Sequence, residues 1–399
     1  MTESQSCVVV HYGEIALKGK NRLFFERKLI RNIKKALKSL PVAGIERLWG
    51  RFVIHLAKNS EVQAIVAALE KVFGIAHYSL GFAIPKEITA IKETAWSLLE
   101  KENFDSFKIE TRRAQKEFPL NSVEINREVG AFIQEKCGKR VNLSKPDATC
   151  FIEIAGPYAL LYSKKLPGLR GLPVGVSEKA VSLISSGIDS PVASYFMLKR
   201  GVNLVYAHFH SQPYTSRVSQ DNTERLIKVL TQYQFRAKVY FLPFIHIQKE
   251  IMAKAPAALR VLLYRRYMVR LSERIAAKEK ATALVTGENV GQVASQTLSN
   301  IRVVSEVTPL PILRPLAGFD KEEIITLAKK IGTFSISTEP YEDCCTLFVP
   351  KSPETKARPV DLVKAEKLLA MEELLENTLD QAEVVLLECE TANGRRETF

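Results

Sequence analysis

A group of small polar residues near the middle of the chain has the composition of an anion-binding loop. These residues follow the apolar run Ala180–Ile184 and carry three hydroxyl groups and one carboxylate: Ser185, Ser186, Gly187, Asp189 and Ser190. Serine hydroxyls and free backbone N–H groups donate hydrogen bonds to phosphate oxygens, and a carboxylate can hold Mg²⁺ between phosphates. A Walker-type loop is excluded because no lysine follows.

The segments on either side of the loop must position it. The run Ala180–Ile184 predicts a strand that is buried on both faces. A helix is predicted to follow, with Ser190 or Asp189 as its N-cap, Pro191 in its first turn and Gly201 just after its end. Such a unit directs unpaired N–H groups and the positive end of the helix dipole to one point.

The loop sequence SSGIDS resembles the SGGxDS pyrophosphate loop (PP-loop) of enzymes that split ATP into AMP and pyrophosphate. It differs at Ser186, where the family usually has a second glycine, and serine restricts positive φ angles. The resemblance implies an ATP site, with Asp189 in a catalytic role and as a Mg²⁺ ligand through the phosphates. The alternative is an ordinary strand–turn–helix with serine caps.

Further polar segments are predicted at the carboxyl ends of strands in the same domain, where doubly wound folds bind ligands. His208 and His210 alternate along a strand and therefore face opposite sides, which disfavours a two-histidine metal site. The segment GENVGQVASQTLSN (Gly287–Asn300) closely resembles the GE-x-x-GQVASQT motif of the tRNA 4-thiouridine synthetase family.

That family resemblance assigns nucleotide contacts to residues spread over this half of the chain. They are the backbone at Leu183, Ile184, His208 and Phe209, together with Arg265, Gly287 and Gln296. Arg265 interrupts an apolar helix, where an exposed charge is the alternative to an arginine that binds phosphate or transition-state charge.

Adjacent cysteines occur in the segment YEDCCTLFVPKSPETK (Tyr341–Lys356). They could be buried spacers, a redox pair or a nucleophile, and a thiolate near bases is reactive. The segment resembles the cysteine-containing loop of 4-thiouridine synthetases, which implies a role in sulfur transfer. Whether Cys344 or Cys345 is the working thiol stays open.

The composition bounds the function. Hydrophobic residues make up 46% and charged residues 25% of the 399 positions, as in a soluble globular protein. No run of eighteen apolar residues and no leader is evident, so we expect a cytoplasmic protein without membrane contact. Six cysteines without a C-x-x-C pair disfavour a disulfide scaffold or a cysteine-ligated metal. The net charge of +13 favours a polyanionic partner over a merely basic surface.

The first 60 residues read as strand, helix, strand, strand. Nine Lys/Arg and the single acid Glu26 lie between Lys18 and Lys38. A solvated basic face is the alternative to nucleic-acid binding by residues such as Lys18, Lys20 and Arg22. The segment HYGEIALKGKNRLFF resembles the N-terminal ferredoxin-like domain of the same family.

Residues 61–165 show an α+β pattern. The segments FKIETRRAQKEFPLNSVEINREVGAFI and VNLSKPDATCFIEI resemble the THUMP domain, an RNA-binding module of tRNA-modifying enzymes. Arg112, Arg113 and Lys116 are predicted to follow a strand directly, where they could meet RNA phosphates or simply face solvent.

The domain order predicted is therefore 1–60 ferredoxin-like, 61–165 THUMP, 166–176 linker and 177–399 PP-loop ATP pyrophosphatase domain. The last is predicted to be α/β with a doubly wound parallel sheet. Within it, Asp320 and Glu323 predict a capping box for the helix Lys321–Ile331, and Val363–Leu379 is predicted to be one helix.

Together these resemblances imply an ATP-dependent tRNA sulfurtransferase that adenylates a uridine, expected at position 8, and makes 4-thiouridine. The chain resembles the short form without a rhodanese domain, so a cysteine desulfurase or another persulfide donor is expected. A homodimer and a sulfur-carrier role in thiamine thiazole synthesis are left open. The alternatives are another PP-loop tRNA-modifying enzyme, such as a 2-thiolase, or a tRNA-binding protein with an impaired loop.

Overall fold

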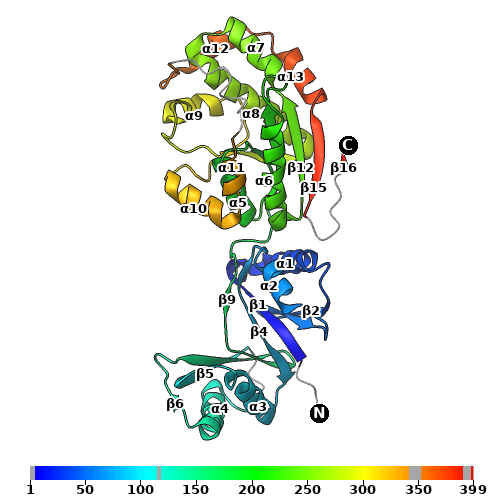
Figure 1. Cartoon of the computed structure of the whole chain (residues 1–399), viewed down its shortest axis with the longest axis vertical. Helices are drawn as coiled ribbons and strands as arrows, with labels where there is room; N and C mark the ends of the chain where they lie inside the picture. The colour runs from blue at the N-terminus through cyan, green and yellow to red at the C-terminus, as the bar shows by residue number, and fades with distance from the viewer. Residues whose placement is uncertain (1–4, 115–117, 341–351, 390–396, 399) are drawn as a thin grey trace. The chain divides into compact units, whose positions relative to one another are not determined.

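The computed structural model describes residues 5–114, 118–340, 352–389 and 397–398. The chain forms two compact units, Met1–Pro173 and Val174–Phe399, which are described separately (Figure 1). The division falls within the Pro- and Gly-rich segment predicted as the linker.

The first unit contains a nine-stranded sheet with the order β2-β3-β1-β4-β8-β7-β5-β6, and β9 pairs with β4. Pairing is antiparallel except that β5 runs parallel to β6 and β7. The strands are β1 Gln5–Tyr12, β2 Val42–Leu48, β3 Arg51–Leu56, β4 Ile75–Pro85, β5 Ser106–Arg113, β6 Arg140–Val141, β7 Ala148–Ala155, β8 Tyr158–Tyr162 and β9 Leu166–Pro167.

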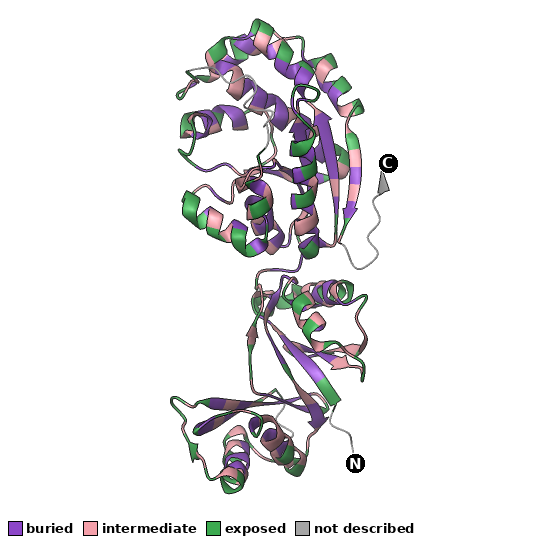
Figure 2. Ribbon diagram, viewed as in Figure 1, coloured by how far each residue is buried: buried purple, intermediate pink, exposed green. Residues whose placement is uncertain are grey.

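Two helix pairs cover this sheet and form separate cores. Leu29 and Ile33 of one pair and Ile91 and Ile125 of the other are fully buried (Figure 2). The first pair is α1 Arg22–Ala36 and α2 Val62–Leu69, and the second is α3 Ile88–Leu99 and α4 Ser122–Cys137. The sequence pattern predicts this first helix over Asn21–Leu40, up to Pro41, whereas α1 ends at Ala36. α2 packs in the same core as α1.

A buried carboxylate joins strands that lie on both sides of β4 in the sheet. Glu153 on β7 accepts hydrogen bonds from His11 on β1 at 3.0 Å and from Tyr162 on β8 at 2.7 Å, and it forms an ion pair with Arg51 on β3. These bonds hold the pKa of Glu153 at about 2, although burial alone would raise it. The sequence analysis did not identify this cluster.

The second unit has the sheet order β14-β13-β10-β11-β12-β15-β16. β10 to β14 pair in parallel, as predicted for a doubly wound sheet, whereas β15 adds an antiparallel edge beside β12. The strands are β10 Lys179–Leu183, β11 Asn203–His210, β12 Arg236–Pro243, β13 Ala281–Val285, β14 Ile312–Leu313, β15 Glu383–Glu388 and β16 Glu397–Thr398.

Helices connect these strands and bury a large apolar core (Figure 2). They are α5 Asp189–Lys199, α6 Val218–Gln234, α7 Ile245–Lys254, α8 Arg260–Glu279, α9 Leu298–Ser305, α10 Lys321–Ile331, α11 Phe334–Ser337, α12 Pro359–Glu366 and α13 Glu372–Asp380. The capping box of α10 is confirmed, because Asp320 accepts from the Glu323 N–H and Glu323 accepts from the Asp320 N–H.

Two helix predictions were wrong. The single helix Val363–Leu379 is two helices, α12 and α13, and the Ala370 N–H between them donates to Glu250 instead of continuing a helix. The N-cap of α5 is Ile188 rather than Asp189 or Ser190. The Ser190 hydroxyl accepts from the Ser185 N–H at 2.9 Å, so it is engaged in the loop instead of capping the helix.

Candidate nucleotide-binding site

A cavity of about 250 Å³ lies at the carboxyl ends of β10, β11 and β13. This is the edge at which doubly wound sheets bind ligands. Most of the residues predicted to contact nucleotide line it together with Asp189: Leu183, Ile184, Ser185, Ser190, His208, Phe209, Arg265, Gly287 and Gln296. Ser186 and Gly187 are not among the lining residues.

The loop between β10 and α5 is held by its own hydroxyl groups. Ser190 Oγ donates to the Ser185 carbonyl at 3.2 Å, and Ser185 Oγ accepts from the Gly187 N–H at 3.3 Å. Both hydroxyls line the cavity, so they can exchange these weak internal bonds for phosphate oxygens.

Ser186 does not strain the loop. Its φ is not positive, because the non-glycine residues with positive φ in the described part of the chain are Arg170, Phe235 and Lys280. The side chain is fully buried, and its hydroxyl lies 3.2 Å from Ser219 Oγ of α6. The freedom of a second glycine is therefore not required here, and Ser186 instead links the loop to α6.

The carboxylate of Asp189 is engaged on both oxygens. Oδ1 forms an ion pair with Lys321 Nζ at 2.6 Å, and Oδ2 accepts from Gln292 Nε2 at 3.1 Å. Lys321 is the first residue of α10, and the sequence analysis did not connect it with the loop. A lysine that the loop sequence itself lacks is thus supplied from a distant helix.

Gly287 is required by close packing. A Cβ atom at this position would lie 2.7 Å from the Ser190 backbone nitrogen and 2.9 Å from the Asp189 carbonyl carbon. The GEN segment therefore packs directly against the start of α5, and any side chain would push the phosphate loop away.

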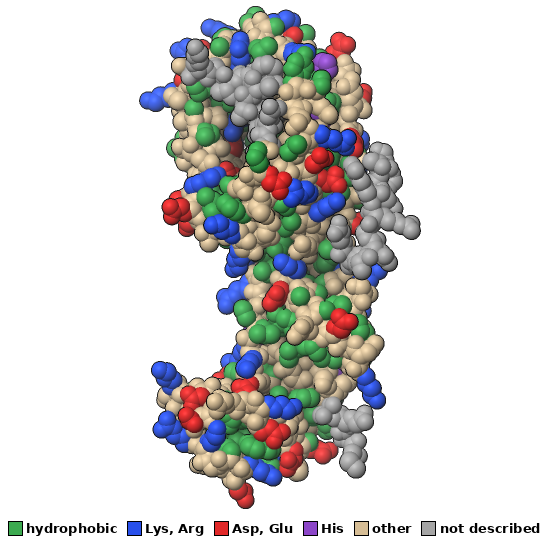
Figure 3. Space-filling model, viewed as in Figure 1, with side chains coloured by type: hydrophobic (Ala, Val, Ile, Leu, Met, Phe, Trp, Pro, Cys, Tyr) green, Lys and Arg blue, Asp and Glu red, His purple; other side chains and the backbone are tan. Residues whose placement is uncertain are grey.

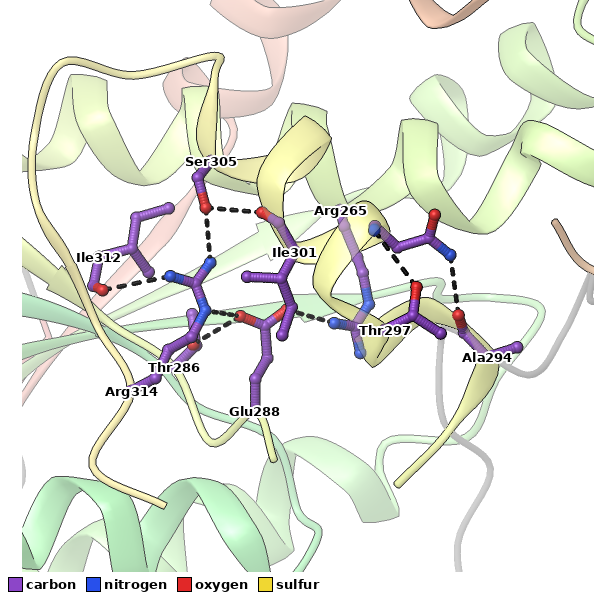
Figure 4. A network of polar contacts seen from close by, with 10 residues as sticks. Arg265, Thr286, Glu288, Ala294, Thr297, Ile301, Ser305, Ile312 and Arg314 are labelled. Carbon is purple, nitrogen blue, oxygen red and sulfur yellow. Dashed lines mark hydrogen bonds and ion pairs between the residues drawn. The ribbon is translucent and has the colours of Figure 1, made fainter. Parts of the chain in front are cut away.

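An ion-pair network forms one wall of the cavity (Figure 4). Glu288, directly after Gly287, forms ion pairs with Arg265 of α8 and with Arg314, which follows β14. Thr286 donates to the same carboxylate at 3.0 Å. The sequence analysis assigned a nucleotide contact to Arg265 and placed Glu288 in the GENVGQVASQT motif without a role, but it did not identify Arg314.

The two histidines of β11 have separate environments. His208 is buried, and its Nδ1 lies 3.0 Å from the Ile184 carbonyl oxygen. Burial, aided by the charges of His208 and Arg217, lowers the pKa of His210 to about 4. No cluster of three or more potential metal-ligating His, Cys, Asp or Glu residues occurs in the part of the chain that the structure describes.

The residues predicted to bind RNA differ in the exposure of their side chains and in how firmly protein groups hold them. Arg112 has a 70% exposed side chain with a loose ion pair to Glu110 at 3.3 Å, and Lys20 is exposed. Arg22 is tied to the buried Glu26 at 2.8 Å and stacks on Trp49, with 4.3 Å from its guanidinium carbon to the ring centroid.

The remaining predicted RNA contacts are constrained or undescribed. Lys18 pairs weakly with Glu14 at 3.4 Å, and Arg113 Nη1 donates to the Leu120 carbonyl. Arg112 and Arg113 lie in the last two positions of β5 rather than after it. Lys116 lies outside the described residues, as do Cys344 and Cys345.

Family models match nearly the whole chain. The ferredoxin-like domain of the ThiI family matches residues 7–79, the THUMP domain residues 85–164, and the family described as "Thiamine biosynthesis protein (ThiI)" residues 175–371. None of these three models is a rhodanese domain.

Whole-length relatives decide the family. A probable tRNA sulfurtransferase of Moorella thermoacetica is 44% identical over 96% of this chain and 98% of its own length. One from Thermoanaerobacter sp. strain X514 is 41% identical over 94% and 98%. The chain belongs to the tRNA sulfurtransferase family. A crystal structure of a 4-thiouridine synthetase–RNA complex with bound ATP also superimposes with a TM-score of 0.88 at 37% identity, covering 96% of this chain and all of the other.

The family relationship agrees with the fold predicted from the sequence. Ferredoxin-like, THUMP and PP-loop domains follow one another in the predicted order. Among the residues that the structure describes, no helix is both long enough and apolar enough to span a membrane.

Proposed function

We propose that this chain is an ATP-dependent tRNA sulfurtransferase that converts a tRNA uridine to 4-thiouridine. The observation that carries the proposal is the cavity at the strand ends, where the loop hydroxyls, Asp189 and Arg265 converge. It is supported by the whole-length similarity to a 4-thiouridine synthetase whose structure contains RNA and ATP.

The loop residues bind and orient the phosphates of ATP. Ser185 and Ser190 donate their hydroxyls to the β- and γ-phosphates, at the N-terminus of α5, whose dipole favours negative charge. The uridine O4 attacks the α-phosphate, its bond to phosphorus forms as the bond to pyrophosphate breaks, and the adenylated base results. Lys321 and Arg265 stabilise the charge that develops on the phosphates.

The donor set fits one Mg²⁺ ion only in company with phosphates. Asp189 is the carboxylate placed to hold it, and Mg²⁺ typically takes one or two protein carboxylates plus substrate phosphates and water. Bound there, the ion would neutralise charge on the leaving pyrophosphate. Lys321, which pairs with Asp189 in the structure, would then turn to a phosphate oxygen.

Adenylation prepares the base for sulfur transfer. The activated C4–O bond breaks as a persulfide sulfur, delivered by a separate donor such as a cysteine desulfurase, attacks C4, and AMP leaves. The thiolate of Cys344 or Cys345 then attacks the donor sulfur of the resulting C4–S–S–donor disulfide. That S–S bond breaks, 4-thiouridine leaves with the outer sulfur, and a disulfide forms between the cysteine and the donor. The target uridine must leave its stack to reach the cavity.

The proposal is tested by reconstitution. Purified protein, unmodified tRNA, ATP, Mg²⁺ and a persulfide donor should release pyrophosphate in a tRNA-dependent manner, and nucleoside mass spectrometry should detect 4-thiouridine. 2-Thiouridine as the product would instead support a 2-thiolase. ATP-independent tRNA binding without pyrophosphate release would support the binding protein, which the ordinary backbone of Ser186 gives no reason to favour.

A further inference from the structure

We propose that Glu288 and Arg314 act together as positioning residues that fix the guanidinium of Arg265 against the cavity while leaving the group of three with one net positive charge. The inference rests on the proposed function, because it concerns the same ATP site. It gives a role to Glu288, a residue of the GENVGQVASQT segment to which the sequence analysis assigned no contact, and to Arg314, which lies outside that segment. The two arginines then have different tasks.

Glu288 is the centre of the network. Its side chain is 8% exposed, and both carboxylate oxygens are engaged, Oε1 by Arg265 and Oε2 by Arg314 at 2.6 Å and Thr286 at 3.0 Å. Burial raises the pKa of Glu288, but the charges of the two arginines outweigh it and the pKa is lowered. The carboxylate is therefore ionised, and both of its oxygens are engaged by protein groups.

Arg314 is the anchor. Besides its ion pair with Glu288, its Nη2 donates to Ser305 Oγ of α9 at 2.8 Å and its Nη1 to the Ile312 carbonyl at 3.3 Å. All three guanidinium nitrogens thus bind protein groups (Figure 4). An arginine held in this way serves as a fixed support for its carboxylate partner.

Arg265 is the member that can reach a ligand. Within the described residues, its polar partner is Glu288, which it contacts through Nη1, so its Nε and Nη2 keep donors for a nucleotide. Its side chain is 23% exposed and lines the cavity. The fixed Glu288 holds one edge of the planar group and thereby orients the other edge.

Charge explains why two arginines are present. A buried pair of Glu288 and Arg265 alone would be neutral and would offer little attraction to a triphosphate. Arg314 compensates the carboxylate, so the group carries +1 and the charge of Arg265 acts on the ligand. Because the cavity wall is largely removed from water, one unit of charge there has a strong effect on anion binding.

Three variants separate charge from position. Arg314→Met makes the group neutral, Glu288→Gln makes it +2, and the double variant restores +1 without the ion pairs. We expect ATP affinity, measured by calorimetry without tRNA, to follow charge. Arg314→Met should bind about tenfold more weakly, Glu288→Gln as tightly as the wild type or tighter, and the double variant within about threefold of the wild type.

The rate of adenylation should follow position instead. At saturating ATP and tRNA, single-turnover pyrophosphate release should fall at least about tenfold in all three variants, because Arg265 loses either Glu288 itself or the Arg314 that anchors Glu288. In an Arg265→Met background, adding Glu288→Gln should change the rate less than about twofold, since Glu288 acts through Arg265.

Ser305→Ala is a less disruptive variant that tests the same idea if the other variants fold poorly. It removes one anchor of Arg314 and no charge, so ATP affinity should be unchanged while the adenylation rate falls. Affinities that drop equally in all three variants, in step with their melting temperatures, would overturn the inference in favour of a purely structural ion pair. Equal effects of Glu288→Gln with and without Arg265 would also overturn it. Failure of the wild type to bind ATP would overturn the proposed function itself.

Discussion

At the scale of single residues, the contact between Asp189 and Lys321 changes how the phosphate loop is understood. The loop sequence contains no lysine, yet Lys321 Nζ lies 2.6 Å from the Asp189 carboxylate. This charge-assisted contact places the Lys321 ammonium beside Asp189, which lines the cavity. The sequence could predict Asp189 from the loop, but not Lys321, because the pair is 132 residues apart.

Replacing Asp189 with alanine should abolish adenylation. The variant loses the carboxylate that pairs with Lys321 and that is proposed to hold Mg²⁺, and loss of such electrostatic stabilisation costs about 10²–10³ in rate. Single-turnover pyrophosphate release measures the effect. Affinity for tRNA should be nearly unchanged. Lys321→Gln, which removes the partner of Asp189, should also lower the rate of pyrophosphate release. Lys330→Gln, at an exposed lysine of the same helix α10, is its matched control. Normal adenylation by Asp189→Ala would show that the loop is only structural.

The adjacent cysteines remain a prediction from the sequence. One serine replacement, at Cys344 or Cys345, should stop thiolation after adenylation, because a single thiol attacks the persulfide and neighbouring thiols rarely share one geometry. Adenylation of tRNA should still occur in that variant but no 4-thiouridine should appear, while the other variant should be much less affected. Nucleoside mass spectrometry gives the readout. Full thiolation by the double serine variant with a persulfide donor would exclude a role for the pair.

At the scale of secondary-structure elements, local signals were reliable and distant ones were not. Both ends of α10 followed from the capping box and from Gly332, whose φ of +85° closes the helix. The single helix predicted over Val363–Leu379 failed because its apolar periodicity continues through a break stabilised by Glu250, a residue far along the chain. The long strand β4 was not predicted at all.

The N-cap of α10 should matter for both stability and catalysis. Asp320→Ala removes the side-chain acceptor for the Glu323 N–H, which costs about 1 kcal/mol of unfolding free energy. Because Lys321 follows directly, the same change should loosen its contact with Asp189 and lower the adenylation rate. Urea unfolding and pyrophosphate release measure the two effects. Asp320→Asn, which retains an acceptor, should restore most of both, and an unchanged rate in Asp320→Ala would separate the cap from the site.

At the scale of the whole molecule, the net charge of +13 does not produce a continuous basic patch on the face that Figure 3 shows. In the view of Figure 3, Lys and Arg side chains are interspersed with Asp and Glu over the surface. The net charge alone therefore does not locate an RNA-binding surface, and individual exposed arginines are the candidates to test. Of the arginines predicted to contact RNA, Arg112 has a side chain that is 70% exposed, whereas that of Arg22 is 18% exposed.

Arg112→Gln should weaken tRNA binding and reduce its salt dependence. Each lost phosphate contact lowers the slope of log K against log salt by about one unit. Filter binding over a salt series measures the slope. Lys101→Gln, an exposed lysine of the same unit with no predicted contact, should leave it unchanged. An unchanged slope for Arg112→Gln would place the RNA elsewhere.

Acid should destabilise the first unit through His77 before it acts on Glu153. Burial, with His11 stacked at 4.4 Å between ring centroids, lowers the pKa of His77 from 6.5 to about 4. A lowered histidine pKa gives stability that is complete above pH 6.5 and is lost as the pH falls towards 4. Glu153, with a pKa of about 2, adds a further loss below pH 4.5 by the same sign.

Tryptophan fluorescence isolates this effect, because both tryptophans of the chain, Trp49 and Trp96, lie in the first unit. The melting temperature followed by fluorescence should fall between pH 6.5 and pH 4, since protonation of His77 is favoured in the unfolded chain. His77→Gln should flatten the profile in that range, whereas His246→Gln, an exposed histidine of the second unit, should leave it unaltered. A wild-type profile that is flat from pH 6.5 to pH 4 would show that His77 titrates alike in both states.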